Sequence, residues 1–296
     1  MQIAIMEFFS SIASPALDVI VMAITMLGEE TLFILFITYL VWNSSKKRGF
    51  AIFSSLALSL IAMGFLKAFI RAPRPFQVLE EIKGKRLETA TGYSFPSGHT
   101  TGAAAFYSAL SLTYRKRIVS LLCAAAILAV GLSRMYLGVH WPIDVFGGLA
   151  LGITGSTILL PRFEAMWEDR QRLMKFTLLA GAVSTAAAFV LTFLLEAGLA
   201  DSVGYTDVMK LLILTGSGYL GFHLSERYNP YETKASTGKK WARYGAGVIL
   251  LLVIQGAKAF LPDTAVVALI RYLLTGLWIT FLFPAIGVRT GLFTRS

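Results

Sequence analysis

Long apolar segments separated by short polar ones dominate the pattern of the chain. An apolar run of this kind predicts a buried or membrane-spanning helix rather than a half-exposed strand. We expect nine such helices, over residues 31–42, 50–70, 99–114, 118–135, 142–160, 176–195, 207–222, 244–261 and 265–288. Before them, residues 1–13 are typical of an interfacial helix, and residues 15–27 of a short interfacial or re-entrant piece. The pattern therefore predicts an all-α, polytopic transmembrane helix bundle of about nine spans.

Composition supports a membrane protein and excludes several other classes. Hydrophobic residues make up 56% of the chain and charged residues 15%, against about 45–50% and 25% in soluble domains. The one cysteine, Cys123, lies in an apolar run, which excludes a disulfide framework and a thiolate zinc site. The N-terminus has no basic region before its apolar stretch and no small-residue cleavage site, so we expect no signal peptide.

The net charge of +10 could indicate a nucleic-acid partner, but the distribution of the basic residues favours membrane topology instead. Most lysines and arginines gather in alternate polar segments, around residues 46–48, 115–117, 162–175, 227–243 and 289–295. The positive-inside rule places these segments and the C-terminus in the cytoplasm. The N-terminus and the loops 71–97 and 135–141 then face outward. The lysines and arginines that depart from this rule cluster in or beside those two outward loops. Binding of an anion is one function that would explain basic residues there.

The twelve residues Ser133–Asp144 lie between two apolar segments and contain an arginine, a histidine and an aspartate. Ionisable groups close to a membrane boundary are costly and are functional candidates. Pro142 suits the first turn of a new helix, which places Asp144 within reach of His140. A carboxylate that holds one ring nitrogen fixes the tautomer and leaves the other nitrogen free as a nucleophile.

Two further clusters carry matching chemistry. Lys67–Pro75 caps the outer end of the segment 50–70, and Tyr93–Thr101 precedes the segment 99–114. Ser97 is a natural N-cap and Gly98 allows close approach to the backbone, so the helix that opens at His99 offers an anion site. By the predicted topology all three clusters lie at one membrane face. Their cations, two histidines and one carboxylate suit the binding of a phosphate and its transfer to histidine.

These motifs, in this order and spacing, resemble the type-2 phosphatidic acid phosphatase superfamily over roughly residues 50–160. The resemblance implies that His140 attacks phosphorus, that Asp144 orients it, and that His99 acts as general acid and then base. It also implies five phosphate-binding residues, namely Lys67, Arg74, Ser97, Gly98 and Arg134. Because fixed cations supply the neutralising charge and no carboxylate cluster is present, we expect no metal and no other cofactor.

The resemblance implies a six-helix phosphatase core, and nine spans with an outward N-terminus are similar to the glucose-6-phosphatase and sphingosine-1-phosphate phosphatase branches. We accordingly expect three parts: an N-terminal interfacial or re-entrant segment (1–30), the catalytic core (31–160) and additional transmembrane helices (161–296). Outside the motifs, Glu29 and Glu30 could pair with loop arginines or meet a cationic headgroup. Residues 84–86 are expected to form a solvated lid, and His223 is expected to be structural.

The leading interpretation is an integral membrane phosphatase that hydrolyses a lipid phosphate monoester or a lipid pyrophosphate at the outer face. The partners would be a phospholipid or polyprenyl (pyro)phosphate and membrane lipids, without nucleic acid. We place it in a bacterial cytoplasmic membrane, with the active site facing the periplasm or exterior. The alternatives are a lipid-linked phosphotransferase, an anion or lipid transporter that uses Lys210, Lys258 and Arg271, and an idle scaffold. The natural lipid and the oligomeric state stay open.

Overall fold

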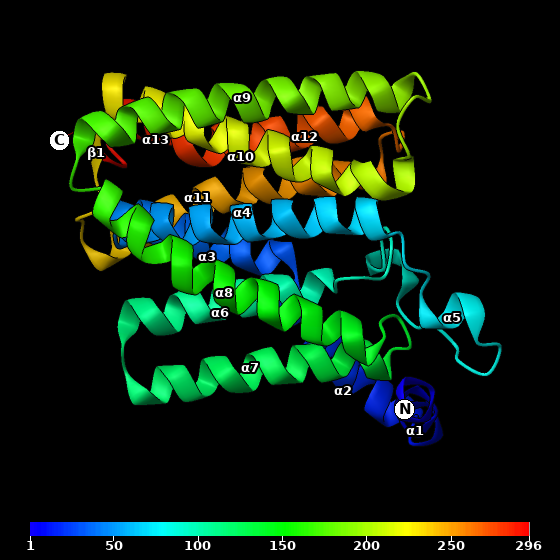
Figure 1. Cartoon of the computed structure of the whole chain (residues 1–296). Coiled ribbons are helices and arrows are strands. Elements are labelled where there is room, and N and C mark those ends of the chain that lie inside the picture. The colour runs from blue at the N-terminus through cyan, green and yellow to red at the C-terminus, as the bar shows by residue number, and fades with distance from the viewer. Residues whose placement is uncertain (296) are drawn as a thin grey trace. The chain divides into compact units, whose positions relative to one another are not determined.

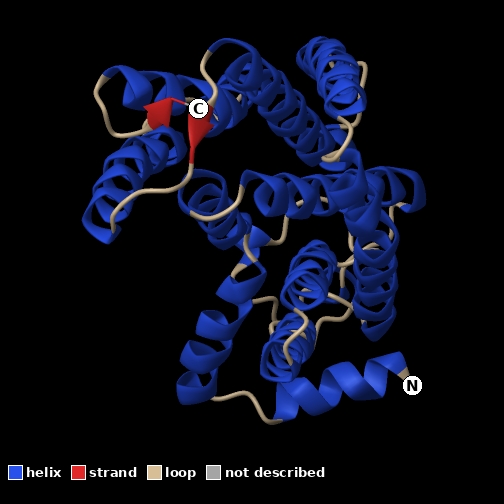
Figure 2. Cartoon of the chain, turned by 90° about the vertical axis from the view of Figure 1, so that its left-hand side faces the viewer, coloured by secondary structure: helices blue, strands red, loops and turns tan. Residues whose placement is uncertain are grey.

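The computed structural model describes residues 1–295, and most of them lie in helices (Figures 1 and 2). The helices are α1 (Gln2–Ser11), α2 (Pro15–Thr25), η1 (Met26–Gly28), α3 (Glu30–Asn43), α4 (Lys46–Ile70), α5 (Pro75–Val78), η2 (Leu87–Thr89), α6 (Gly98–Tyr114), α7 (Arg117–Tyr136), α8 (Pro142–Met166), α9 (Arg170–Glu196), α10 (Ser202–Tyr228), α11 (Thr237–Gly256), η3 (Ala257–Ala259), α12 (Ala265–Leu277), the π-helical η4 (Trp278–Leu282) and α13 (Phe283–Arg289). Two short strands, β1 (Tyr231–Glu232) and β2 (Thr294–Arg295), pair antiparallel. The predicted all-α class is confirmed.

The predicted count of nine spans is not confirmed. Helix occupies each of the nine predicted ranges, but within residues 1–295 only six helices are both long and apolar enough to cross a membrane. A seventh span results if α2 with η1 and α3, which meet at a 45° bend, are taken as one broken span. The difference arises because α3 and α6 are short, at 14 and 17 residues. α10 is long enough, at 27 residues, but is not among the helices apolar enough to cross a membrane.

The chain forms two compact units that are discontinuous in sequence. Unit 1 consists of Met1–Ile34, Ile52–Pro161 and Val203–Asp207, and unit 2 contains the rest of the described chain. All three motif clusters lie in unit 1.

In unit 1, glycines on α8 allow its backbone to pack directly against α6. A Cβ atom at Gly148 would lie 2.9 Å from the carbonyl oxygen of Ser97, and one at Gly152 would lie 2.5 Å from that of Thr101. Small residues permit this close approach between membrane helices. The packing, together with a hydrogen bond of 3.0 Å from the Ser97 amide to the Asp144 carbonyl, places the start of α6 beside the start of α8.

Aromatic packing and a buried arginine define the core of unit 2. The rings of Trp42 and Phe283 have centroids 4.5 Å apart, and Trp42 Nε1 donates to the Ile279 carbonyl at 2.8 Å. Arg243 is fully buried. Its Nε donates to Asn43 Oδ1 at 2.5 Å, which gives the buried charge a polar partner, as burial requires.

Candidate active site

His140 and Asp144 meet at the start of α8, in unit 1. α7 ends at Tyr136, and α8 begins at Pro142 with Asp144 in its first turn. His140 Nδ1 lies 3.3 Å from Asp144 Oδ2, and both residues are almost fully buried. The same carboxylate oxygen accepts hydrogen bonds from the Trp141 amide, at 2.7 Å, and from the Ser94 hydroxyl. Three donors therefore converge on Asp144 Oδ2 and fix it against the imidazole.

The opposite nitrogen of His140 faces an arginine. Arg74 Nη1 lies 3.2 Å from His140 Nε2. A guanidinium group can only donate, so Nε2 must accept, and the ring proton is then on Nδ1. In this tautomer Nδ1 donates to Asp144, and the Nε2 lone pair accepts from Arg74, so a substrate must displace this hydrogen bond before Nε2 can act as a nucleophile.

Arg74 itself is held by backbone carbonyls. Its guanidinium donates to the carbonyls of Thr91, Gly92, Tyr93 and Val139 at 2.7, 3.1, 3.3 and 2.8 Å. Lys67 donates to the same Tyr93 carbonyl at 2.5 Å. Arg74 and Lys67 therefore fix the loop that leads to α6, and they carry their charge beside His140.

Arg134 and His99 present buried polar atoms that no group of the described chain satisfies. Arg134 is fully buried, and its Nη1 donates to Thr25 Oγ1 at 3.0 Å. Its Nε and Nη2, and His99 Nε2, have no hydrogen-bond partner. Unsatisfied buried polar groups of this kind call for an explanation, and an anionic ligand that accepts from them is one.

The N-terminus of α6 adds backbone amides to the same region. The Ser97 side chain is its N-cap and accepts from the Thr100 amide at 3.4 Å and from the Thr100 hydroxyl at 2.9 Å. At Gly98 the nearest atom to an added Cβ is the Met63 methyl at 3.5 Å. The first turn of α6, which includes His99, therefore has the positive dipole end that favours an anion.

The structure brings the eight residues singled out in the sequence into unit 1, and it adds three contacts to them from residues that were given no role from the sequence. Ser94 donates to Asp144, and Thr25 accepts from Arg134. Asp207, at the end of the third segment of unit 1, accepts from the Thr91 hydroxyl at 2.6 Å and interacts electrostatically with Lys67. Each lies far along the chain from its partner, so spacing within the sequence could not have found it.

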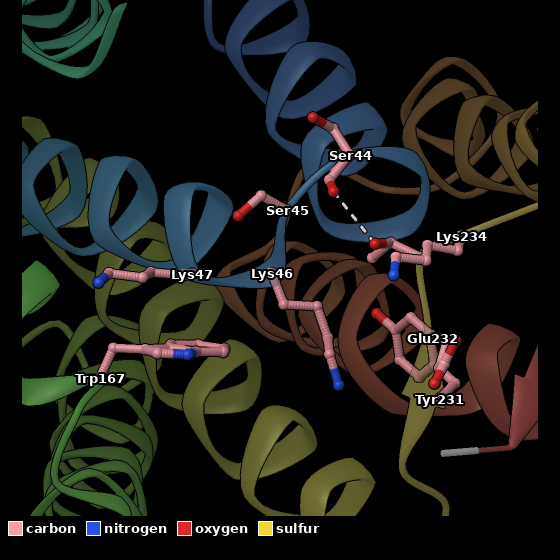
Figure 3. A pocket seen from close by; sticks show the side chains of 9 residues that line it. Ser44, Ser45, Lys46, Lys47, Trp167, Tyr231, Glu232 and Lys234 are labelled. Carbon is pink, nitrogen blue, oxygen red and sulfur yellow. Dashed lines mark hydrogen bonds between the residues drawn. The ribbon is translucent and has the colours of Figure 1, made fainter.

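Unit 2 contains a pocket of about 390 Å³, which Figure 3 shows. Two of its three lysines pair with carboxylates, Lys46 with Glu226 at 2.5 Å and Lys47 with Glu168. The Thr233 hydroxyl, which also lines the pocket, donates to the Ser44 carbonyl at 3.0 Å. The pocket contains no histidine or cysteine. His140, the nucleophile predicted from the sequence, lies in unit 1.

Among residues 1–295, no group of three or more His, Cys, Asp or Glu side chains is arranged to hold a metal ion. Arg271, one of the cations considered for a transport pathway, donates in unit 2 to the Gln255 side chain at 2.9 Å and to its carbonyl at 3.1 Å. This contact anchors the arginine to a neighbouring helix.

Apolar helices around a buried cluster of histidines, arginines and one carboxylate are the features of a membrane-embedded phosphatase. Comparison with family models gives the class: residues 48–168 match the PAP2 superfamily, and residues 211–295 match the PAP2 superfamily phosphatase, transmembrane extension. The chain is a member of the PAP2 superfamily and an integral membrane protein. The family resemblance predicted from the motifs is confirmed.

Individual relatives are similar over parts of the chain. Phosphatidylglycerophosphatase B of Bacillus subtilis is 38% identical over 72 residues, which are 21% of this chain and 36% of that protein. Undecaprenyl-diphosphatase of Sulfolobus acidocaldarius is 34% identical over 115 residues, 38% of this chain and 54% of that protein. The crystal structure of Aquifex aeolicus LpxE aligns with a TM-score of 0.49 and 26% identity, and covers 54% of this chain and 94% of that one. The chain thus spans about half or less of the length of these two curated relatives.

Proposed function

We propose that the protein hydrolyses a lipid phosphate, either a monoester or the terminal phosphate of a diphosphate, through a phosphohistidine at His140. The observation that carries the proposal is the state of this imidazole. Its Nδ1 lies against Asp144 and its Nε2 lone pair faces a cluster of cations. The similarity to a phosphatidylglycerophosphatase and to an undecaprenyl-diphosphatase supports a lipid substrate.

In the proposed reaction Arg74 Nη1 transfers its hydrogen bond from His140 Nε2 to a phosphate oxygen. The freed Nε2 attacks phosphorus, and the bond from phosphorus to the leaving oxygen breaks. His99 gives that oxygen a proton. In the second step His99 takes a proton from water, whose oxygen attacks the phosphohistidine and releases phosphate and free His140. The unpartnered Nε and Nη2 of Arg134, with Arg74, Lys67 and the Ser97–Gly98 turn, would bind the non-bridging oxygens. Donors preorganised around the charge that develops are the largest catalytic contribution in many enzymes.

We propose that this chemistry takes place at the outer membrane face, with the C-terminus in the cytoplasm. The basis is the concentration of lysine and arginine in the alternate segments of the chain, such as Lys46–Arg48 and Arg115–Arg117. A phosphate held at the end of α4 and at the start of α6 lies beside apolar helices, so the acyl or prenyl chain of a substrate can stay in the bilayer.

The purified protein is expected to release inorganic phosphate from at least one member of a panel of phosphatidic acid, phosphatidylglycerophosphate, a long-chain-base phosphate and a polyprenyl diphosphate. Phosphate is measured directly, and labelled lipid products are separated to detect transfer to another hydroxyl. No release from any member of the panel by folded protein would contradict the proposal.

Chelation of divalent metals is expected to leave activity unchanged. In the proposed site Lys67, Arg74 and Arg134 neutralise the negative charge of the phosphate group, so Mg²⁺ is not required for that purpose. The measurement is the rate of phosphate release with excess EDTA, compared with the rate in added MgCl₂. A loss of activity in EDTA that MgCl₂ restores would show that fixed cations are insufficient.

The acid limb of the pH profile of kcat/KM is expected to lie below pH 6.5. Burial, and then the charges of Arg74 and Lys67, hold the pKa of His140 well below its ordinary value of 6.5. The imidazole of the free enzyme therefore stays neutral and nucleophilic as the pH falls through that value. Because kcat/KM reports the ionisation of groups in the free enzyme, its acid limb follows the lowered pKa. In the unfolded chain this histidine has its ordinary pKa and binds a proton at a higher pH than in the folded protein. His140 therefore lowers the free energy of unfolding as the pH falls below about 6.5. Profiles of kcat/KM and of thermal stability between pH 4.5 and 8 test both statements.

A further inference from the structure

The N-terminal segment lies outside residues 48–168, which match the family model, yet it contacts the candidate site. We propose that Thr25 is a positioning residue that orients Arg134 toward the bound phosphate. The inference rests on the proposed phosphatase function and deepens it, because it assigns the site a residue from a part of the chain that the family match does not cover.

The contact between Thr25 and Arg134 is direct and enclosed. Arg134 Nη1 donates to Thr25 Oγ1 at 3.0 Å, and both residues have no exposed surface. Nε and Nη2 of the same guanidinium have no partner. The guanidinium group is planar and rigid, so one hydrogen bond at Nη1 restricts the direction in which the remaining donors point.

The chemical nature of the partner matters as much as its position. A carboxylate in the place of Thr25 would fix Arg134 but would also cancel much of its charge. A hydroxyl oxygen orients the group and leaves the charge available to a phosphate, with which arginine forms strong, frequently bidentate hydrogen bonds. Threonine at this position therefore suits a cation that must bind an anion.

The segment that carries Thr25 is itself fixed in unit 1. A Cβ at Gly28 would lie 2.8 Å from Val130 Cγ1 and 3.1 Å from the His99 carbonyl, so η1 packs against α7 and the start of α6. Tyr107 donates from its hydroxyl to the Leu27 carbonyl at 3.0 Å. Arg86 pairs with Glu29 at 2.5 Å and donates to the Met22 carbonyl at 3.1 Å. These contacts on both sides prevent Thr25 from moving away from Arg134.

The test compares Thr25→Val, which removes the hydroxyl at nearly constant volume, with Thr25→Ser, which keeps it. Thr38→Val is the matched control, because Thr38 is equally buried and its hydroxyl has no partner. We expect Thr25→Val to lower kcat/KM about tenfold or more, and to weaken inhibition by orthovanadate by a similar factor. We expect Thr25→Ser to stay within about threefold of wild type, and Thr38→Val to leave both quantities unchanged.

Thermal unfolding of each variant separates positioning from stability. Should Thr25→Val fail to fold, Thr25→Ala is measured in its place against the same control. Equal kcat/KM and orthovanadate inhibition in wild type and the folded Thr25 variant would overturn the inference, as would equal losses at Thr25 and Thr38. Either result with an active wild type leaves the proposed function standing. A wild type without activity on the whole panel overturns the proposed function itself.

Discussion

Replacement of His140 with alanine is expected to lower phosphate release by more than about 10⁴-fold. The imidazole is the only proposed nucleophile, and loss of a nucleophile from a concerted set of groups removes nearly all of the catalysis that the set provides. Its burial excludes bulk water from the space that it leaves, since only 2% of its surface is exposed. Initial rates on the best lipid of the panel measure the effect.

The matched control is His223→Ala. His223 is also buried, at 8% exposure, but lies in unit 2 with its Nδ1 3.1 Å from the Met174 carbonyl. We expect this variant to keep activity within about twofold. A second readout uses substrate labelled in its terminal phosphate, rapidly quenched at alkaline pH. The wild type and His223→Ala should retain protein-bound label, and His140→Ala should retain none; label that persists in His140→Ala would place the covalent intermediate elsewhere.

The sequence predicted those parts of the site in which partners are close along the chain. His140 and Asp144 are four residues apart across a proline, and Ser97 caps a helix that opens one residue later, so local rules place them. The helices were predictable for the same reason, because each forms within one continuous apolar segment. The number of membrane spans was less predictable than the helices, because a helix such as α3 or α6 forms without being long enough to cross a bilayer alone.

Long-range contacts were beyond the reach of spacing. The contact of Thr25 with Arg134 joins residues 109 apart, and that of Thr91 with Asp207 joins residues 116 apart. Of the two interpretations of Glu29, the structure gives the pairing with a loop arginine, Arg86. The expectation of a solvated lid is wrong at Arg86, whose side chain is only 17% exposed, because its charge finds a carboxylate on a segment distant in sequence.

Replacement of Asp144 is expected to have the second largest effect, and two variants separate its orienting role from its charge. The Trp141 amide and the Ser94 hydroxyl, which both donate to Oδ2, can hold the oxygen of an asparagine in the same place. Asp144→Asn should therefore keep the tautomer of His140 but lose the negative charge that stabilises the imidazole as it becomes positive. We expect a loss in kcat/KM of about 100-fold, and a loss of about 10³-fold or more in Asp144→Ala, which also frees the ring to turn.

Asp169→Asn is the control for the isosteric change, because Asp169 caps α9 by accepting from the Arg172 amide and asparagine caps a helix equally well. It should leave activity and thermal stability unchanged. The relative activities of the Asp144 variants distinguish the orienting role of the carboxylate from its charge. Equal losses in Asp144→Asn and Asp144→Ala would mean that charge alone matters at this position, whereas wild-type activity in either variant would remove Asp144 from the proposed mechanism. The expected order, with asparagine between wild type and alanine, requires both that the carboxylate holds His140 Nδ1 and that its charge is felt in the transition state.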